Sequence, residues 1–296
     1  VHSGDSACII PSVHITAENV ATIKEYTKKI AEEMHVVGLM NMQYAIEKGK
    51  VYVLEANPRA SRTVPLVSKV CNVRMVPIAT DIITSELTGR PSPVPALKEQ
   101  HIPYYGVKEA VFPFNMFPEV DPILGPEMRS TGEVLGLSTY YGEAFYKAQE
   151  ATQTLLPTSG TVLISVNRKD KDEVIEIAQL FEKAGFKILA TSGTYAIITA
   201  AGVKAEKVKK LQEGRPNIND LITNGSIDLI INSPSGKESA HDDSYLRKAA
   251  IKAKIPYVTT IAGARATAKG ILYVQAHGDS DVKSLQELHS EIKDAE

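Results

Sequence analysis

Hydrophobic and polar positions at the start of the chain follow first a helical period and then an extended one. Residues 16–35 carry apolar side chains at three- and four-residue steps, and Thr16 is suited to cap the first turn, so this stretch predicts an amphipathic helix. Residues 39–46 and 51–57 contain the apolar runs of two short strands. Gly49 lies between them and indicates a turn. We therefore expect a helix followed by a hairpin.

Proline and glycine divide the next part of the chain. Residues 76–87 predict a second helix, which stops at the helix breaker formed by residues 89–91. Prolines are dense in residues 91–136, and this stretch predicts a long ordered connection over a surface rather than regular elements.

Beyond residue 160 the pattern changes to apolar runs that alternate with segments of helical spacing. Strands that alternate with helices are typical of a parallel, doubly wound α/β sheet. The polar segment 151–160 precedes this change, so we predict one domain at residues 1–150 and another at residues 151–296. The predicted strands are residues 161–166, 186–191, 226–232 and 255–260, and the predicted helices are residues 172–185, 192–202, 243–254 and 261–270.

The composition is that of a globular protein. The 296 residues are 43% hydrophobic and 23% charged, and 33 Lys and Arg face 35 Asp and Glu, which gives no sign of a nucleic-acid partner. No apolar run approaches the roughly 18 residues of a membrane span, and no basic-then-apolar signal opens the chain. Cys8 and Cys71 are too few for a disulfide scaffold, so we expect a cytoplasmic protein. Val1 lies inside what reads as a motif, and we expect the chain to be a fragment.

The run LEANPRASRT, residues 54–63, places polar side chains at the end of an apolar strand. Glu55 and Asn57 are two residues apart, and side chains of an extended strand alternate between faces, so they point the same way. A carboxylate and a carboxamide supply the hard oxygen ligands that Mg²⁺ prefers. Gln43, on the neighbouring strand, joins them if the hairpin loop has an odd number of residues. The pattern predicts a divalent-metal site.

Arg59 and Arg62 add positive charge just past this predicted metal site. Guanidinium groups suit phosphoryl oxygens, and phosphoryl transfer is catalysed mostly by positioning and charge neutralisation. The alternative is structural, with Glu55 at a strand end forming ion pairs with its own downstream arginines. The E-x-N-x-R pattern alone leaves both interpretations open.

Longer strings in the chain resemble a known family. A strand followed by E-x-N, with an amide on the preceding strand, is similar to the metal-binding end of the ATP-grasp ligases. Three strings resemble the large subunit of the carbamoyl phosphate synthetases and occur in the same order as in that family. They are HSGDSA, NPRASRTVPLVSK and GPEMRSTGEV. The resemblance covers essentially the whole chain. It implies an α/β chain: a partial ATP-grasp α+β unit, of the kind that makes carbamoyl phosphate, followed by a methylglyoxal-synthase-like allosteric domain.

The resemblance implies a ligase that uses ATP with Mg²⁺ or Mn²⁺, and K⁺ is a further candidate ion. It assigns Gln43, Glu55 and Asn57 to the metals that bridge the ATP phosphates. Arg59 and Arg62 are expected to face the transferred phosphoryl group and the carbamate. The remainder of the ATP cleft is expected outside this chain, so the chain alone is expected to be inactive. The implied nucleotide contacts are Val1, His2, Ser3, Gln43 and Glu55.

The run TSGT, residues 191–194, ends one predicted strand and opens a helix. Free N–H groups and the positive end of a helix dipole favour an anion there. Doubly wound sheets also bind ligands at the carboxyl ends of their strands, and the end of a further strand offers Asn232, Ser233 and Ser235 nearby. The alternative is that the Ser and Thr side chains only cap the helix.

This half of the chain resembles the methylglyoxal-synthase-like domain that binds regulatory nucleotides. Methylglyoxal synthases carry an acidic GGDQQ motif after the equivalent strand, whereas this chain has SGKESAHDD, so we predict a binding module and not a second enzyme. His241, Asp242 and Asp243 are better explained as helix caps than as metal ligands. Pro234 replaces a threonine of the relatives, which leaves the effector open. The implied contacts of a nucleoside monophosphate are Lys171, Thr191, Thr194, Lys210 and Asn232.

The resemblance also implies an ornithine site between the two domains, and partners. The partners are a glutaminase small subunit and the remainder of the large subunit in an oligomeric enzyme of arginine and pyrimidine biosynthesis. A carboxylase or purine-pathway ligase is disfavoured because the chain lacks a biotin-domain pattern and has the regulatory half. A free-standing nucleotide-binding regulatory module without catalysis is disfavoured because it has no need of the metal and arginine residues. The implied ornithine contacts are Asp5, Glu109, Tyr257 and Thr259.

Overall fold

The structure is a computed structural model that describes residues 2–117, 124–233, 240–278 and 282–294. The chain forms two compact units, and each of them is discontinuous in sequence. The sheet unit consists of Val1–Cys8 and Val107–Val282, and the hairpin unit consists of Ile9–Gly106 and Lys283–Glu296. The predicted boundary near residue 150 stays a prediction. None of the helices formed by the described residues has the length and apolar character that a bilayer crossing requires.

The hairpin unit begins with the predicted helix and hairpin, α1 (Ala17–Glu33), β2 (Asn41–Glu47) and β3 (Lys50–Asn57). The Thr16 side chain accepts a hydrogen bond from the Asn19 N–H at 3.2 Å, which confirms the predicted N-cap. The remaining elements of this unit are α2 (Thr63–Cys71), α3 (Met75–Thr88), β4 (Gln100–His101), α10 (Leu285–Ser290) and β12 (Lys293–Asp294).

The sheet unit contains strands in the stretch for which no regular elements are expected. A three-stranded sheet has the order β1 (Cys8–Ile10), β5 (Tyr105–Val111) and β6 (Gly132–Ser138), so the expectation for residues 91–136 is wrong. The prolines flank β5 and do not interrupt it, because Pro103 precedes the strand and Pro113 follows it. Proline inside a strand would remove a ladder hydrogen bond, but proline at its ends is compatible with pairing.

The predicted parallel, doubly wound sheet is confirmed. Its five strands have the order β11-β10-β7-β8-β9, and all neighbours pair in parallel. The chain moves outward from β7 to β9, returns to β10 beside β7, and continues to β11, so the order reverses at β7 and β10. The strands are β7 (Thr161–Ser165), β8 (Lys187–Thr191), β9 (Glu206–Val208), β10 (Leu229–Asn232) and β11 (Tyr257–Val258).

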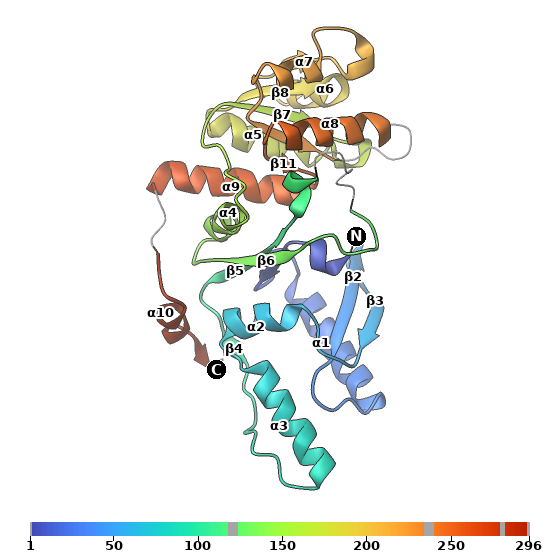
Figure 1. Ribbon diagram of the computed structural model, residues 1–296, viewed down its shortest axis with the longest axis vertical. Coiled ribbons are helices and arrows are strands. Elements are labelled where there is room, and N and C mark those ends of the chain that lie inside the picture. The colour runs from blue at the N-terminus through green and yellow to red at the C-terminus, as the bar shows by residue number, and fades with distance from the viewer. Residues whose placement is uncertain (1, 118–123, 234–239, 279–281, 295–296) are drawn as a thin grey trace. The chain divides into compact units, whose positions relative to one another are not determined.

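Helices cover both faces of this sheet (Figure 1). Val162 and Ile164 of β7 join a core with α5, α6 and α9, whereas Leu163 joins a core with α7 and α8. Successive strand residues thus enter opposite cores, which is why the strands read as continuous apolar runs. The helices are α4 (Tyr141–Ala151), α5 (Val174–Lys183), α6 (Ser192–Ala200), α7 (Ile218–Thr223), α8 (Ala240–Lys252) and α9 (Ile261–His277).

Candidate functional site

The β2–β3 hairpin places the predicted metal ligands on one face. Gln43 pairs directly with Glu55, and Asn41 pairs directly with Asn57. Residues that lie opposite each other in an antiparallel ladder project from the same face, and so do residues two apart along one strand. The hairpin therefore presents one carboxylate and three carboxamides together, and Gln43 and Glu55 are both exposed.

A β-bulge at Leu54 produces this pairing. The turn consists of Lys48 and Gly49, with φ values of 50° and 78°, the left-handed pair of a tight hairpin turn. The loop is therefore even, so regular pairing from this turn does not meet the condition under which Gln43 joins Glu55 and Asn57. An unbroken ladder from this turn would place Gln43 opposite Leu54. The register shifts at this point instead, so Leu54 is the extra residue of the bulge and Gln43 faces Glu55.

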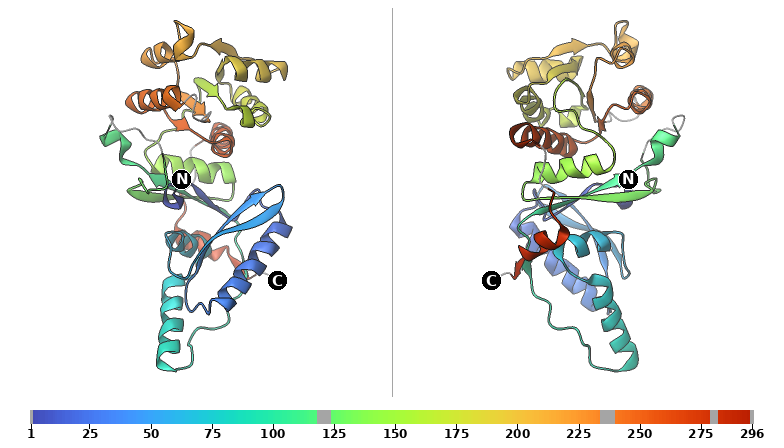
Figure 2. Two further views of the ribbon diagram at one scale, coloured as in Figure 1. Left: turned by 90° about the vertical axis from the view of Figure 1, so that its right-hand side faces the viewer. Right: turned by 60° about the vertical axis from the view of Figure 1, so that its left-hand side comes forward.

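The other face of the hairpin packs against α1, which lies along the two strands (Figure 2). Tyr44 and Val51 point to that face, since they alternate with the polar set. Val51 is buried, and the Tyr44 hydroxyl lies 2.7 Å from the Thr27 hydroxyl of α1. Burial of this face leaves the polar face of the hairpin open.

Arg59 and Arg62 connect β3 to α2, and both are exposed. The Arg59 N–H donates to the Asn57 carbonyl at 2.8 Å, which turns the chain directly after the strand. Its Nη1 donates to the Ala60 carbonyl at 3.0 Å. Arg62 is the N-cap residue of α2. Within the described part of the chain neither arginine forms an ion pair with Glu55, so the structural alternative finds no support.

Two of the sequence strings that carry the family resemblance meet in the sheet unit. The His2 N–H donates to the Gly125 carbonyl, and the two carboxylate oxygens of Asp5 accept from the Arg129 and Ser130 N–H groups, each at 2.9 Å. Burial acts to raise the pKa of Asp5, but the bonds from Arg129 and Ser130 outweigh it and the pKa lies below its usual value. Asp5 is 4% exposed and holds the two strings together.

Three of the implied ATP contacts, Val1, His2 and Ser3, lie at the start of the sheet unit. Val1 is outside the described residues. The His2 ring caps a short 3-10 helix, Ser3–Asp5, because its Nδ1 accepts a bond from the Gly4 N–H at 3.0 Å. This bond fixes the ring tautomer, since the accepting nitrogen carries no proton. Ser3 is exposed.

Two hydrogen bonds join the end of β7 to the TSGT run, where the nucleotide site is predicted. The Thr191 hydroxyl donates to the Ser165 hydroxyl at 3.1 Å, and the buried Thr194 hydroxyl accepts from the Val166 N–H at 3.2 Å. TSGT ends β8 and opens α6, as predicted. Thr191 is the N-cap residue but makes no side-chain cap hydrogen bond, so simple capping does not explain its hydroxyl.

Lys171 reaches the start of α6. A Cβ built on Gly193 would lie 2.5 Å from the Lys171 Nζ, so the glycine leaves the space that the ammonium group occupies. The Lys171 charge thus lies at the N-terminus of α6, where the helix dipole is positive, and both favour an anion. Lys210 precedes a 3-10 helix, Leu211–Glu213, and its N–H donates to the Glu213 carboxylate at 2.9 Å.

Asn232 joins the two predicted effector sets. Its Nδ2 donates to the Tyr257 hydroxyl at 2.8 Å, from the end of β10 to the neighbouring strand β11. Asn232 is 1% exposed, so its side chain is buried at the carboxyl end of β10. A residue assigned to the nucleotide therefore contacts a residue assigned to ornithine.

The other predicted ornithine residues have separate surroundings. The Glu109 carboxylate accepts bonds from Gln149 Nε2 at 2.9 Å and from the Ala110 N–H at 3.3 Å. Burial raises the pKa of Glu109, although these bonds and the Lys108 charge oppose the shift. Thr259 is exposed and lies between β11 and α9. Among the described contacts, none connects Asp5, Glu109 and Thr259 directly.

Sequence reasoning overlooks Asn41, Ser165 and Val166. Asn41 lies two residues before Gln43 on the same strand, and this spacing is the signal that identifies it. Ser165 and Val166 end a strand beside TSGT, but only the parallel pairing of β7 with β8 connects them to it. Pro234 and Ser235, and the side chains of His241, Asp242 and Asp243, lie outside the described residues.

Known proteins match both parts of the chain. Residues 1–87 match the family "Carbamoyl-phosphate synthase L chain, ATP binding domain", and residues 173–259 match the family "MGS-like domain". A carbamoyl phosphate synthase large chain from Methanosarcina barkeri is 40% identical over 294 residues, which cover 99% of this chain and 73% of that protein. The chain belongs to the carbamoyl phosphate synthase large-chain family.

Other carbamoyl phosphate synthase large chains are longer. The protein from Archaeoglobus fulgidus is 48% identical over 98% of this chain, which spans 27% of that protein. A "Carbamoyl phosphate synthase large chain, C-terminal section" from Aquifex aeolicus is 45% identical over 98% of this chain and 57% of its own length. The solved methylglyoxal synthase from Elizabethkingia anophelis NUHP1 is 21% identical, with a TM-score of 0.32 over 38% of this chain and 79% of that chain.

Family membership confirms the predicted fold class and the resemblance. The carbamoyl phosphate synthase ATP-binding match includes the hairpin and α2, and the MGS-like match includes TSGT and Asn232. The chain thus combines part of a carbamoyl phosphate synthase ATP-binding domain with an MGS-like domain.

Proposed function

We propose that the hairpin unit supplies one wall of the site where ATP phosphorylates carbamate. A carbamate oxygen forms a bond to the γ-phosphorus of ATP, the bond from that phosphorus to the β–γ bridging oxygen breaks, and carbamoyl phosphate and ADP leave. The observation that carries this proposal is the alignment of Gln43, Glu55 and Asn57 on the open face of the hairpin.

The donor set suits Mg²⁺ or Mn²⁺, because one carboxylate and neighbouring amide oxygens are hard ligands that leave room for phosphate oxygens and water. When bound, the metal would neutralise phosphate charge. Glu55 contributes the negative charge of this set, whereas Gln43, Asn57 and the newly identified Asn41 contribute neutral oxygens that orient the phosphates. The bulge at Leu54 holds the carboxylate opposite Gln43.

Arg59 and Arg62 stabilise the charge that develops on the transferred phosphoryl group and the carbamate. Their guanidinium groups are exposed and can turn to form paired hydrogen bonds with the oxygens. Val1, His2 and Ser3 contact the adenosine end, and K⁺ is a further candidate ion. The chain spans only 27% of the Archaeoglobus fulgidus relative. We therefore infer that other parts of a large chain complete the ATP cleft and that this chain alone is inactive.

The sheet unit regulates the reaction by binding a nucleoside monophosphate at the ends of β8 and β10. Lys171 and the start of α6 bind the phosphate, with support from Thr191, Thr194, Lys210 and Asn232. Ornithine binds near Glu109, Tyr257 and Thr259, and the Asn232–Tyr257 bond couples the two effectors.

A glutaminase small subunit supplies ammonia in a cytoplasmic, oligomeric enzyme of arginine and pyrimidine biosynthesis.

Arg62→Ala in the complete large chain is expected to lower carbamate-dependent ADP release about a hundredfold, because one donor to the transition-state charge is lost. Formation of ATP from ADP and carbamoyl phosphate, the reverse reaction, should fall by the same factor. Arg74→Ala is the matched control, since Arg74 is the exposed N-cap residue of α3. An Arg62→Ala enzyme with wild-type rates in both directions would contradict the proposed role.

Gly193→Ala is expected to weaken binding of uridine monophosphate about tenfold, because the added Cβ takes the space of the Lys171 ammonium group. Lys171→Ala should have a similar effect, and neither change should alter the weak binding of uridine. Lys169→Ala is the control, because Lys169 is an exposed lysine two residues away. Calorimetric titration measures the affinities of the wild-type chain and the three variants for uridine monophosphate and for uridine. Equal affinities for uridine and its monophosphate would leave TSGT without an anion-binding role.

A further inference from the structure

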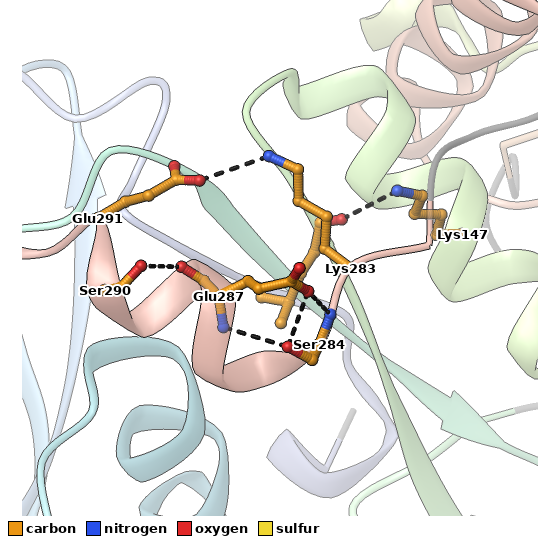
Figure 3. Close-up of polar contacts among 7 residues, drawn as sticks. Lys147, Lys283, Ser284, Glu287, Ser290 and Glu291 are labelled. Atoms are coloured by element: carbon orange, nitrogen blue, oxygen red, sulfur yellow. Dashed lines mark hydrogen bonds and ion pairs between the residues drawn. The ribbon is translucent and has the colours of Figure 1, made fainter.

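The end of the chain forms a short structured segment, residues 283–294, which we call the C-terminal segment. Its helix α10 begins with a capping box, in which the Ser284 N–H and hydroxyl donate to the Glu287 carboxylate at 2.6 and 2.8 Å (Figure 3). The Ser290 hydroxyl donates to the Glu287 carbonyl at 2.6 Å, and Lys283 pairs with Glu291 at 3.4 Å. These local bonds give the segment a defined shape.

This segment docks on the rest of the hairpin unit by backbone pairing. β12 pairs antiparallel with β4, with Lys293 opposite His101 and Asp294 opposite Gln100. Leu288 of α10 is only 5% exposed. Lys98 and Asp294 form an ion pair of 3.0 Å on the surface. Because solvent screens it, this ion pair contributes little to the stability of the docked segment. The pairing of β12 with β4 therefore places α10 on this unit, and Leu288 is buried there.

Docking brings His289 to the C-terminal end of α2. Its Nε2 donates to the Lys69 carbonyl at 2.6 Å. The next carbonyl, that of Val70, accepts a bond of 2.7 Å from the hydroxyl of Tyr104, which is 1% exposed. The last carbonyls of a helix have no partner within the helix, so side chains that donate to them fix its end. An imidazole is also favourable there, because the end of the helix carries partial negative charge.

The opposite end of α2 carries Arg62. The helix has 9 residues, so about 13 Å separate its ends and a shift at one end moves the other as a rigid body. Val64, Leu66 and Val70 are its buried residues, and they prevent the helix from leaving the core. The bonds from His289 and Tyr104 restrain sliding along the axis and rotation at the C-terminal end of the helix.

We propose that the C-terminal segment positions Arg62 for phosphoryl transfer by holding α2, and that His289 is the positioning residue. This inference rests on the proposed role of Arg62 in carbamate phosphorylation. His289 does not touch the reactants, so its loss alters the placement of Arg62 and leaves nucleotide binding intact. A displacement of a reactive group by about 1 Å is enough to slow a reaction substantially.

The test is kinetic and uses the complete large chain with its partner subunits. His289→Ala is expected to lower kcat for carbamate-dependent ADP release about three- to fivefold, the size that one hydrogen bond supports, with KM for ATP unchanged. His289→Gln keeps an amide donor and should restore most of the rate. His277→Ala is the matched control, because the His277 ring lies 2.9 Å from the Tyr273 carbonyl of its own helix. Unchanged kcat in His289→Ala would overturn the proposal.

A double-mutant cycle separates positioning from general destabilisation. If His289 acts through Arg62, then His289→Ala in an Arg62→Ala background should lower the residual rate no further. A further three- to fivefold loss in that background would show that His289 is only structural and would overturn the inference. If Arg62→Ala alone leaves the rate unchanged, the proposed role of Arg62 in phosphoryl transfer is wrong. An error in the role of Arg62 and an error in the role of His289 therefore give different results.

Discussion

Glu55→Gln in the complete enzyme is expected to reduce carbamoyl phosphate formation about a thousandfold or more, even in saturating Mg²⁺ and ATP. The substitution keeps the size and shape of the side chain but removes the single negative charge of the proposed ligand set, which consists of Gln43, Glu55 and Asn57. The fold should survive, because Glu55 is exposed and the hairpin is held by its other, apolar face. Initial-rate measurements of carbamoyl phosphate and a thermal unfolding scan test both statements.

Glu47→Gln is the matched control for this change. Glu47 is an exposed acid on the same hairpin and pairs with Lys50 beside the turn, at the end of the ladder away from Asn57. Its loss removes the same charge from the same face and should change the rate less than twofold. A Glu55→Gln enzyme within threefold of wild type would remove Glu55 from the ligand set.

Gly142→Ala is expected to destabilise the chain by about 3 kcal/mol, although alanine normally favours a helix. Gly142 lies on α4 where this helix crosses α9. A Cβ at Gly142 would lie 2.8 Å from the carbonyl carbon of Lys269 and 2.9 Å from the Gly270 nitrogen, and both are backbone atoms that cannot rotate away. A Cβ at Gly270 would likewise lie 2.7 Å from the Gly142 oxygen. The helices approach this closely because both residues are glycine.

A fall of the melting temperature by roughly 6 °C or more is the expected measurement. Gly193→Ala is the control, since Gly193 is also a helical glycine near an N-terminus but its Cβ would meet only the flexible end of Lys171. It should leave the melting temperature unchanged or slightly higher. If both variants unfold at the wild-type temperature, then α4 and α9 separate more easily than their backbone contact indicates.

The second half of the chain was the more predictable part because its signals are local. Each strand of a two-sided parallel sheet is a short apolar run, as in TVLIS and LIIN, and the helices between them carry their own spacing. TSGT lies where the sequence places it, at the end of β8. The partners of its hydroxyls, Ser165 and the Val166 N–H, could not be predicted, because they depend on which strand lies beside β8.

The candidate site in the first half was predicted by residue type but not by geometry. Simple alternation along β3 places Glu55 on the same face as Val51, which packs toward α1. The bulge at Leu54 reverses this relation and moves Glu55 to the open face with Gln43. No element was predicted for the residues that directly follow the hairpin, whereas Thr63–Cys71 form α2, with Pro65 in its first turn. Proline is tolerated in a first turn, where its missing N–H would have had no partner.

The sequence by itself determined the chemistry available to this protein and the class of its fold, because residue types and hydrophobic periods act over a few neighbouring positions. It placed an acid, amides and arginines after one strand, and after another it placed the TSGT run, for which we propose an anion-binding role. Only the tertiary structure decided how Gln43 comes to face Glu55, that Asp5 holds Arg129 and Ser130, and that His289 reaches Lys69. Each of these contacts depends on ladder register or on segments distant in the chain. Such contacts are selected by burial over the whole unit and leave no local period in the sequence.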